Sequence, residues 1–190
     1  MFAVMGILSS MKRWGMCFLS WVTLAMPVWA EPVAEPFPGY TELCGYPLIT
    51  ASTARVALAK LNRAGQPIIV LDPVLEQPAE RHRRVFLIAH ECAHHLMGHV
   101  QAQALRERTR SRRVVRDHEL SADCWAAEVL AKAGLDRSVR VMEDRFFRSG
   151  LYSPGGGYPA GVQRATIIRE CAQVGRMNTD PRTKQVDTTR

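Results

Sequence analysis

The sequence predicts an α+β fold that is rich in helices and carries one small β-sheet. Long segments place apolar residues at helical spacing, glycines follow several of these segments, and one short β-branched run stands between prolines. The chain has 190 residues with ordinary hydrophobic and charged fractions, which allows one domain with a core but not two. We therefore expect a single folded domain in which helices outweigh strands.

The first 30 residues predict a secretory signal peptide. A basic pair, Lys12 and Arg13, precedes an apolar run that ends at Met26, and small residues up to Ala30 fit a cleavage site. The run is shorter than the roughly 20 apolar residues that span a bilayer. We expect cleavage after Ala30 and a secreted or periplasmic mature protein, with an uncleaved N-terminal anchor as the alternative.

The next elements alternate between irregular, helical and extended segments. Residues 31–45 begin with a proline-rich stretch and predict an extended lead-in outside the core. Residues 50–65 predict a helix that ends at Gly65. The apolar run Ile68–Leu71 lies between two prolines, which predicts a strand at the edge of a sheet.

The remainder of the chain is predicted to be mostly helical. Apolar spacing and terminal glycines predict helices at 81–105, 116–133 and 137–149, then an irregular loop at 153–161 and a short helix through Cys171. The domain should cover residues 46–175. Residues 176–190 are polar without periodicity, which predicts a disordered tail.

Four cysteines follow the predicted signal peptide, namely Cys44, Cys92, Cys124 and Cys171. An even number of cysteines in an oxidising compartment predicts two disulfides. Spacing does not choose among the three possible pairings. Four small buried thiols are the alternative interpretation.

The segment FLIAHECAHHLMGH, residues 86–99, places several polar groups in an apolar helix, and these need partners if they are buried. Residues four apart on a helix differ by about 40° around the axis and about 6 Å along it. The imidazoles of His90 and His94 can therefore bind one metal ion. Glu91 is rotated by about 100° from His90, so it can reach a metal-bound water without being a ligand. Zinc suits such a site.

A third metal ligand is expected from the predicted helix that contains DHELSADCWAAEVL, residues 117–130. Glu119 and Asp123 are four residues apart and therefore share one face of this helix. We expect Glu119 to be the third ligand and Asp123 to orient a metal-bound histidine, namely His90.

The two motifs HECAHH and ELSADCWAA together resemble the gluzincin metallopeptidases, which combine His-Glu-x-x-His with Glu-x-x-Ala-Asp. The resemblance covers about residues 48–172. It is closest to the prenyl-protein protease branch and to the small neutral zinc metallopeptidases with an Ala-Asp-Cys second motif. It implies a zincin-like catalytic domain with one Zn²⁺, whose edge strand borders the active-site cleft.

The activity implied by this resemblance is hydrolysis of peptide or protein substrates. A zinc-activated water would attack the peptide bond with Glu91 as general base, and the strand Ile68–Leu71 would hold the extended substrate. The later segment GYPAGVQR has tyrosine where the family has histidine before proline. Tyr158 and Arg164 of this segment are the expected stabilisers of the oxyanion.

Two other functions are compatible with the sequence. The first is a non-catalytic, zinc-stabilised domain that binds a partner, although a structural zinc site does not need Glu91 and usually has more cysteine ligands. The second is hydrolysis of a non-peptide amide. Zinc analysis combined with chelator-sensitive cleavage would separate the three functions.

The remaining charged and histidine residues are assigned less specific roles. The run from Arg106 to Arg116 holds six arginines and is interpreted as a solvated connector, or as a patch that contacts anionic surfaces. We expect no nucleic-acid partner, because no aromatic residues accompany these arginines. The other histidines are predicted to lie off the metal face or at the surface: His82, His95, His99 and His118.

Overall fold

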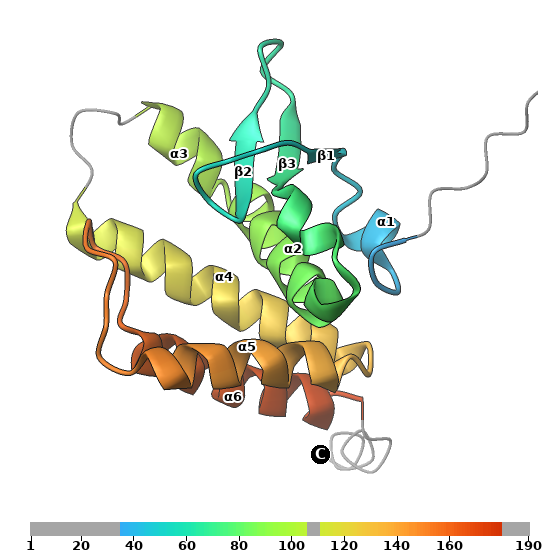
Figure 1. Ribbon diagram of the computed structural model, residues 1–190, viewed down its shortest axis with the longest axis vertical. Helices are drawn as coiled ribbons and strands as arrows, with labels where there is room; N and C mark the ends of the chain where they lie inside the picture. Colours follow the sequence, from blue (N-terminus) through green and yellow to red (C-terminus); the bar gives the residue numbers. More distant parts are fainter. Residues whose placement is uncertain (1–34, 106–110, 180–190) are drawn as a thin grey trace, which may run out of the picture. The chain divides into compact units, whose positions relative to one another are not determined.

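The β-sheet is small, mixed and built around a buried central strand (Figure 1). The computed structural model describes residues 35–105 and 111–179. Strand β3 (Pro67–Leu71) is the central strand. It pairs in parallel with β1 (Leu48–Thr50) and antiparallel with β2 (Ala57–Leu61). The α+β class predicted from the sequence is confirmed.

The predicted strand exists, but its predicted position at the edge of the sheet is wrong. Four of the five residues of β3 are buried, as is typical of a continuous apolar run with neighbours on both sides. The flanking prolines do not interrupt its pairing, because Pro67 is the first residue of the strand and Pro73 lies beyond its end.

The predicted helix at residues 50–65 is also wrong, because β2 and a hairpin turn occupy this segment. Helix propensity of the Ala and Leu residues is overridden here by pairing with β3. The side-chain oxygen of Asn62 accepts hydrogen bonds from the amides of Ala64 and Gln66. Gly65, expected to end a helix, adopts a φ of +77° in this turn.

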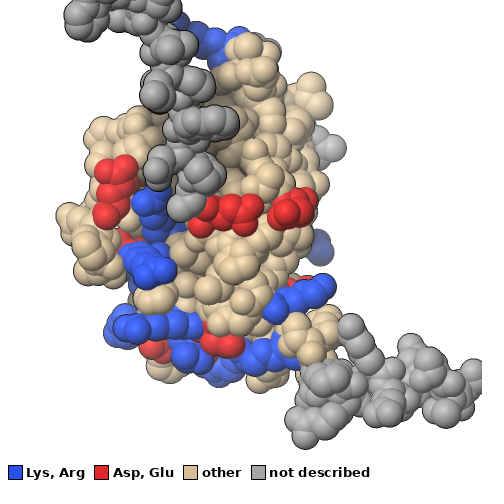
Figure 2. Space-filling view, turned by 90° about the vertical axis from the view of Figure 1, so that its right-hand side faces the viewer, with Lys and Arg blue, Asp and Glu red and all other residues tan. Residues whose placement is uncertain are grey.

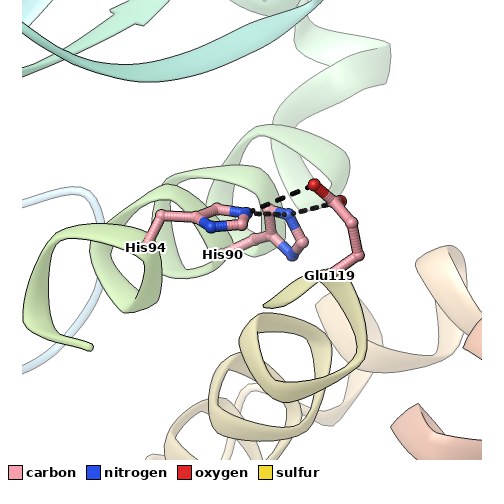
Figure 3. Close-up of side chains that lie close together, drawn as sticks. All are labelled: His90, His94 and Glu119. Carbon is pink, nitrogen blue, oxygen red and sulfur yellow. Dashed lines mark hydrogen bonds and ion pairs between the residues drawn. The ribbon is translucent and has the colours of Figure 1, made fainter. Parts of the chain in front are cut away.

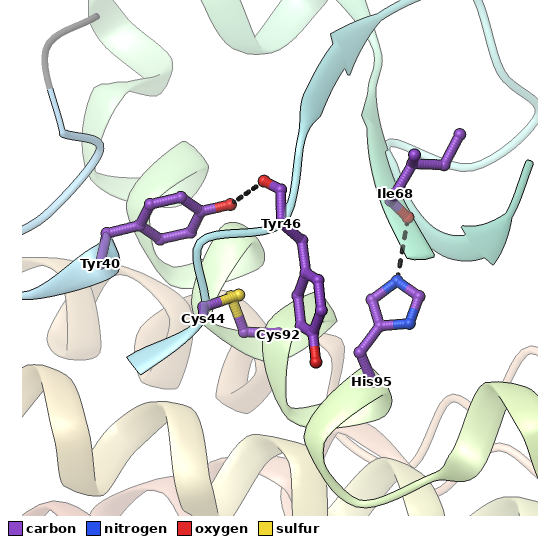
Figure 4. Close-up of a disulfide and its surroundings, with 6 residues drawn as sticks. All are labelled: Tyr40, Cys44, Tyr46, Ile68, Cys92 and His95. Atoms are coloured by element: carbon purple, nitrogen blue, oxygen red, sulfur yellow. Dashed lines mark hydrogen bonds between the residues drawn. A yellow bond between two sulfur atoms is a disulfide. The ribbon is translucent and has the colours of Figure 1, made fainter. Parts of the chain in front are cut away.

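The proline-rich lead-in contributes to the core, contrary to the prediction for residues 31–45. Phe37 and Tyr40 are buried, and a short helix α1 (Tyr40–Leu43) follows the prolines. The Tyr40 hydroxyl donates a hydrogen bond to the carbonyl oxygen of Tyr46 over 2.6 Å (Figure 4). A disulfide between Cys44 and Cys92 then joins this segment to the helix that carries the histidine motif.

Helix α2 lies between the sheet and a layer formed by the three later long helices (Figure 1). Two short 3-10 turns, Pro73–Glu76 and Pro78–Glu80, lead into α2. The helices are α2 (Arg81–Leu96), α3 (His99–Leu105), α4 (Arg112–Lys132), α5 (Asp136–Ser149) and α6 (Gly161–Met177). None of the helices within the described ranges is long and apolar enough to cross a membrane.

Three helix boundaries differ from the prediction. The expected helix at 81–105 is broken at Gly98, which has a φ of +70°, into α2 and α3. Helix α4 begins at Arg112, so the second part of the arginine run is helical rather than a connector. Helix α6 continues to Met177, two residues into the predicted tail. The predicted signal peptide, the arginines at 106–110 and the tail from 180 onward lie outside the described residues.

The lower helical layer carries many of the basic side chains. Figure 2 shows Lys and Arg gathered over the lower part of one face, with Asp and Glu among them. Two ion pairs link α6 to α5, Arg169 with Glu143 and Arg176 with Asp136. Exposed pairs of this kind contribute about 0–1 kcal/mol each, so burial rather than charge stabilises this layer.

Helices α4 and α6 pack with very close backbones. A Cβ atom placed on Gly175 would lie 2.4 Å from the carbonyl oxygen of Glu128, so only glycine fits there. A second disulfide, between Cys124 and Cys171, joins the same two helices. The two predicted disulfides are therefore present, and the structure supplies the pairing that the sequence left open.

We expect the double substitution Cys124→Ala and Cys171→Ala to lower the free energy of unfolding by about 2–4 kcal/mol. The bond closes a separation of 47 residues, which limits the conformational entropy of the unfolded chain. Urea unfolding without reductant measures the effect. The matched comparison is the double substitution of Cys44 and Cys92 by alanine, because a separation of 48 residues predicts a similar loss of unfolding free energy. A change below about 1 kcal/mol would contradict the prediction.

Candidate metal centre

Helices α2 and α4 bring two buried histidines and one buried glutamate together. His90 and His94 lie one turn apart on α2, and Glu119 faces them from α4 (Figure 3). Each of the three residues is less than 10% exposed. Their potential ligand atoms all lie within 4.8 Å of one another, so the group could hold a metal ion. The structure thus brings together the three ligands predicted from the sequence.

The spacing of these ligand atoms fits a small divalent cation. The Nε2 atoms of His90 and His94 are 3.1 Å apart, and the Glu119 carboxylate oxygens lie 3.4 Å from His90 and 3.7 Å from His94. Tetrahedral zinc with bonds of about 2.0–2.1 Å separates its ligand atoms by about 3.3 Å. Two imidazoles and one carboxylate also form a donor set that zinc accepts in sites with one open position.

Asp123 lies behind His90, as the sequence predicted. Its Oδ1 atom is 2.9 Å from His90 Nδ1, which leaves the Nε2 atom of that ring directed at Glu119 and His94. Asp123 is completely buried. A carboxylate in this position fixes the orientation and tautomer of a metal-binding histidine.

Arg164 on α6 completes a buried chain of contacts that the sequence did not predict. Its Nε and Nη2 atoms donate hydrogen bonds of 2.6 and 2.7 Å to the two carboxylate oxygens of Asp123. The guanidinium also lies 4.0 Å from the centre of the Phe146 ring. A bidentate pair such as Arg164 with Asp123 is strong and geometrically specific. The oxyanion role expected for Arg164 stays a prediction, since Arg164 also lines the pocket that the three candidate ligands border.

Glu91 is held at the edge of the sheet. The backbone amide of Ala59 in β2 donates a 2.7 Å hydrogen bond to Glu91 Oε2. Ala59 pairs with Ile69 of β3, whose own amide bonds toward β1, to the carbonyl of Pro47. The Ala59 amide therefore points away from the sheet and toward α2, and this one contact fixes the Glu91 carboxylate beside the two histidines.

A pocket of about 600 Å³ joins these groups. It lies between β2, α2, α5 and the glycine-rich loop before α6. Six of the seven predicted site residues line it: His90, Glu91, His94, Glu119, Tyr158 and Arg164. The guanidinium of Arg55 lies 5.4 Å from the centre of the Tyr158 ring. The edge strand at this pocket is β2, not the predicted Ile68–Leu71.

The charges of the cluster favour ionised carboxylates. Burial opposes ionisation of Glu119, but hydrogen bonding and charge from His90 lower its pKa to about 2. Burial likewise opposes ionisation of Asp123, and the charge of Arg164 outweighs it and lowers the pKa of that carboxyl. Carboxylates must be ionised to bind a metal, and the low pKa of Glu119 keeps it ionised at neutral pH.

The pKa values of the two histidines and of Glu91 are shifted in different directions. Burial lowers the pKa of His94 to about 3, with a further contribution from the charge of His90. Burial also acts against the charged form of His90, but hydrogen bonds to Asp123 and Glu119 outweigh it and raise its pKa to about 10. The pKa of Glu91 is raised, chiefly by burial. Burial beside an ion cluster moves all three pKa values from their ordinary positions.

The other histidines divide into two groups. His95 points away from the cluster, as predicted, and its Nε2 atom lies 2.9 Å from the carbonyl oxygen of Ile68 (Figure 4). His99 was predicted to lie off the metal face, but its Nδ1 atom is 3.0 Å from Nδ1 of His94. The prediction failed because it assumed an unbroken helix, whereas the break at Gly98 redirects His99. His118, expected at the surface, is partly buried and stacks on His99 with ring centres 3.9 Å apart.

Comparisons of the chain with protein-family models, curated proteins and solved structures found no match. The resemblance to gluzincins therefore stays a prediction from two short motifs.

Proposed function

We propose that the chain is a secreted or periplasmic zinc metallopeptidase with a zincin-like core. One observation carries this proposal, namely that Glu91 shares a pocket with the buried cluster of His90, His94 and Glu119. A site that only stabilises the fold needs ligands but no additional carboxylate beside an open pocket. Glu91 is such a carboxylate, since the three-residue cluster does not include it.

Zinc is the proposed metal, held by His90, His94 and Glu119. Bound there, zinc would lower the pKa of a water molecule and polarise the scissile carbonyl. Asp123 would keep the His90 ring in its binding orientation, and Arg164 would keep the Asp123 carboxylate in place. The two disulfides support an oxidising compartment, because such bonds persist outside the cytosol.

Glu91 is the proposed general base. Its Oε2 atom is fixed by the Ala59 amide, which leaves Oε1 for the attacking water. Glu91 would take a proton from this water and deliver it to the leaving amine. Burial raises the pKa of Glu91. A carboxylate whose pKa lies closer to neutral pH can both accept a proton and release it again. Tyr158, which lines the same pocket, remains the proposed oxyanion stabiliser.

Strand β2 is the proposed site for the peptide backbone. Its residues Ala57, Leu58 and Ala59 line the pocket, and β2 is an outer strand of the sheet. Residues two apart in a strand direct their backbone groups the same way. Ala57 therefore presents its amide and carbonyl on the outer side of β2, where they are available to an extended substrate.

The test of the proposal combines metal analysis with cleavage of a mixed peptide library. We expect about one zinc per chain, cleavage of peptide bonds, loss of cleavage on treatment with a chelator, and recovery when zinc is restored. Bound zinc without chelator-sensitive cleavage would overturn the proposal in favour of a zinc-stabilised partner-binding domain. Cleavage confined to small non-peptide amides would indicate the third function. Absence of metal binding would overturn the proposal completely.

A further inference from the structure

We propose that His99 is a positioning residue that fixes the tautomer and orientation of the metal ligand His94. The inference rests on the proposed metal centre but not on peptide cleavage. The two Nδ1 atoms are 3.0 Å apart, and both rings are buried. Their planes meet at 68°, an edge-on arrangement in which one ring nitrogen faces the other.

The chemistry of imidazole determines which ring nitrogen of His94 and of His99 carries a proton. A neutral histidine that offers Nε2 to a metal carries its proton on Nδ1. The Nδ1 proton of His94 must therefore be donated, and the neighbouring acceptor is Nδ1 of His99. His99 is then neutral with its proton on Nε2. With zinc bound to His94, the two adjacent buried histidines would therefore be opposite tautomers.

The fold holds His99 in this position in two ways. Gly98 has a φ of +70°, a conformation that ends α2 and starts α3 with His99 directed back at His94. On its other side, His99 stacks on His118 of α4 with an interplanar angle of 9°. The turn at Gly98 therefore sets where the His99 ring lies, and the stacking on His118 sets the orientation of its plane.

The Nδ1 atoms of the two proposed metal-binding histidines therefore face different partners. His90 faces the ionised carboxylate of Asp123, whereas His94 faces a neutral imidazole. Outer partners of metal ligands typically change metal affinity by about 10- to 100-fold when they are removed. His99 should belong to this class although it touches no metal ligand atom of the cluster directly.

The test replaces His99 with phenylalanine and with glutamine. Phenylalanine keeps an aromatic ring against His118 but removes the acceptor, and glutamine restores an acceptor oxygen. We expect His99→Phe to weaken zinc binding by about 10- to 100-fold and to change the visible spectrum of the Co²⁺-substituted protein. His99→Gln should recover most of the affinity. His95→Phe is the matched control, because His95 is equally buried but contacts Ile68 instead.

Several outcomes are decisive. Wild-type zinc affinity and an unchanged Co²⁺ spectrum in His99→Phe would overturn the inference. If that variant does not fold, long-range ¹H–¹⁵N spectra of the zinc-loaded wild-type protein decide instead. They should show a proton on Nδ1 of His94 and on Nε2 of His99, and a proton on Nδ1 of His99 would overturn the inference. Zinc binding without any peptidase activity would contradict only the proposed function.

Discussion

Replacing Glu91 with glutamine is expected to leave zinc binding intact and to slow peptide cleavage by about 10²- to 10⁴-fold. Glutamine has nearly the same shape, and its side-chain oxygen can still accept the hydrogen bond from the Ala59 amide. What the substitution removes is the ability to take a proton from water. Because Glu91 is not one of the three clustered ligand residues, the metal content should not change.

The measurement for this variant pairs zinc analysis with the cleavage rate of one library peptide. The matched control is Glu170→Gln, since Glu170 is exposed on α6 and lies outside the residues that line the pocket. The control should cleave at the wild-type rate. A Glu91→Gln variant with wild-type activity would refute the role of general base, and one that loses its zinc would show that Glu91 is a ligand.

The candidate site could be predicted well where it depends on helical spacing. His90 and His94, like Glu119 and Asp123, are separated by one helical turn, and the structure places each pair on one face. The contact between His90 and Asp123 was also predicted correctly. These relations are local within each helix, so they need only the geometry of the helix and the assumption that the two helices meet.

The parts that failed depend on contacts between distant segments. Strand β2 has a sequence of good helix formers, and only its pairing with β3 makes it a strand. The contact between Arg164 and Asp123 could not be predicted, because the two residues lie 41 positions apart on different helices. The orientation of His99 depends on Gly98, which could have predicted the break, since glycine followed by a new helical segment is a common end of a helix.

Contacts from several elements explain why the candidate ligands can remain buried. The sheet provides the amide that holds Glu91, α4 provides Glu119 and Asp123, and α6 provides the arginine that compensates Asp123. One disulfide attaches the N-terminal segment to α2 and the other attaches α6 to α4, so each of the two helices with candidate ligands is cross-linked. The buried charges are therefore paired within elements that disulfides cross-link, an arrangement that suits a preorganised metal site.

Zinc binding should also stabilise the fold strongly, and Glu119→Gln should abolish most of this effect. A ligand at 1,000 times its dissociation constant adds about 4 kcal/mol to the free energy of unfolding. For a domain of this size, 1 kcal/mol corresponds to about 2–4 °C in Tm, so zinc should raise Tm by about 8–16 °C. Glutamine removes the negative charge that faces the two histidines but preserves the shape of the side chain.

Thermal unfolding with and without zinc measures this difference for each variant. In Glu119→Gln the zinc-induced shift should fall below about 3 °C, because less than 1 kcal/mol of binding energy would remain. Glu128→Gln is the matched control, since Glu128 lies on the same helix but outside the cluster, and it should keep the full shift. A full shift in Glu119→Gln would place the bound zinc elsewhere and contradict the site built by α2 and α4.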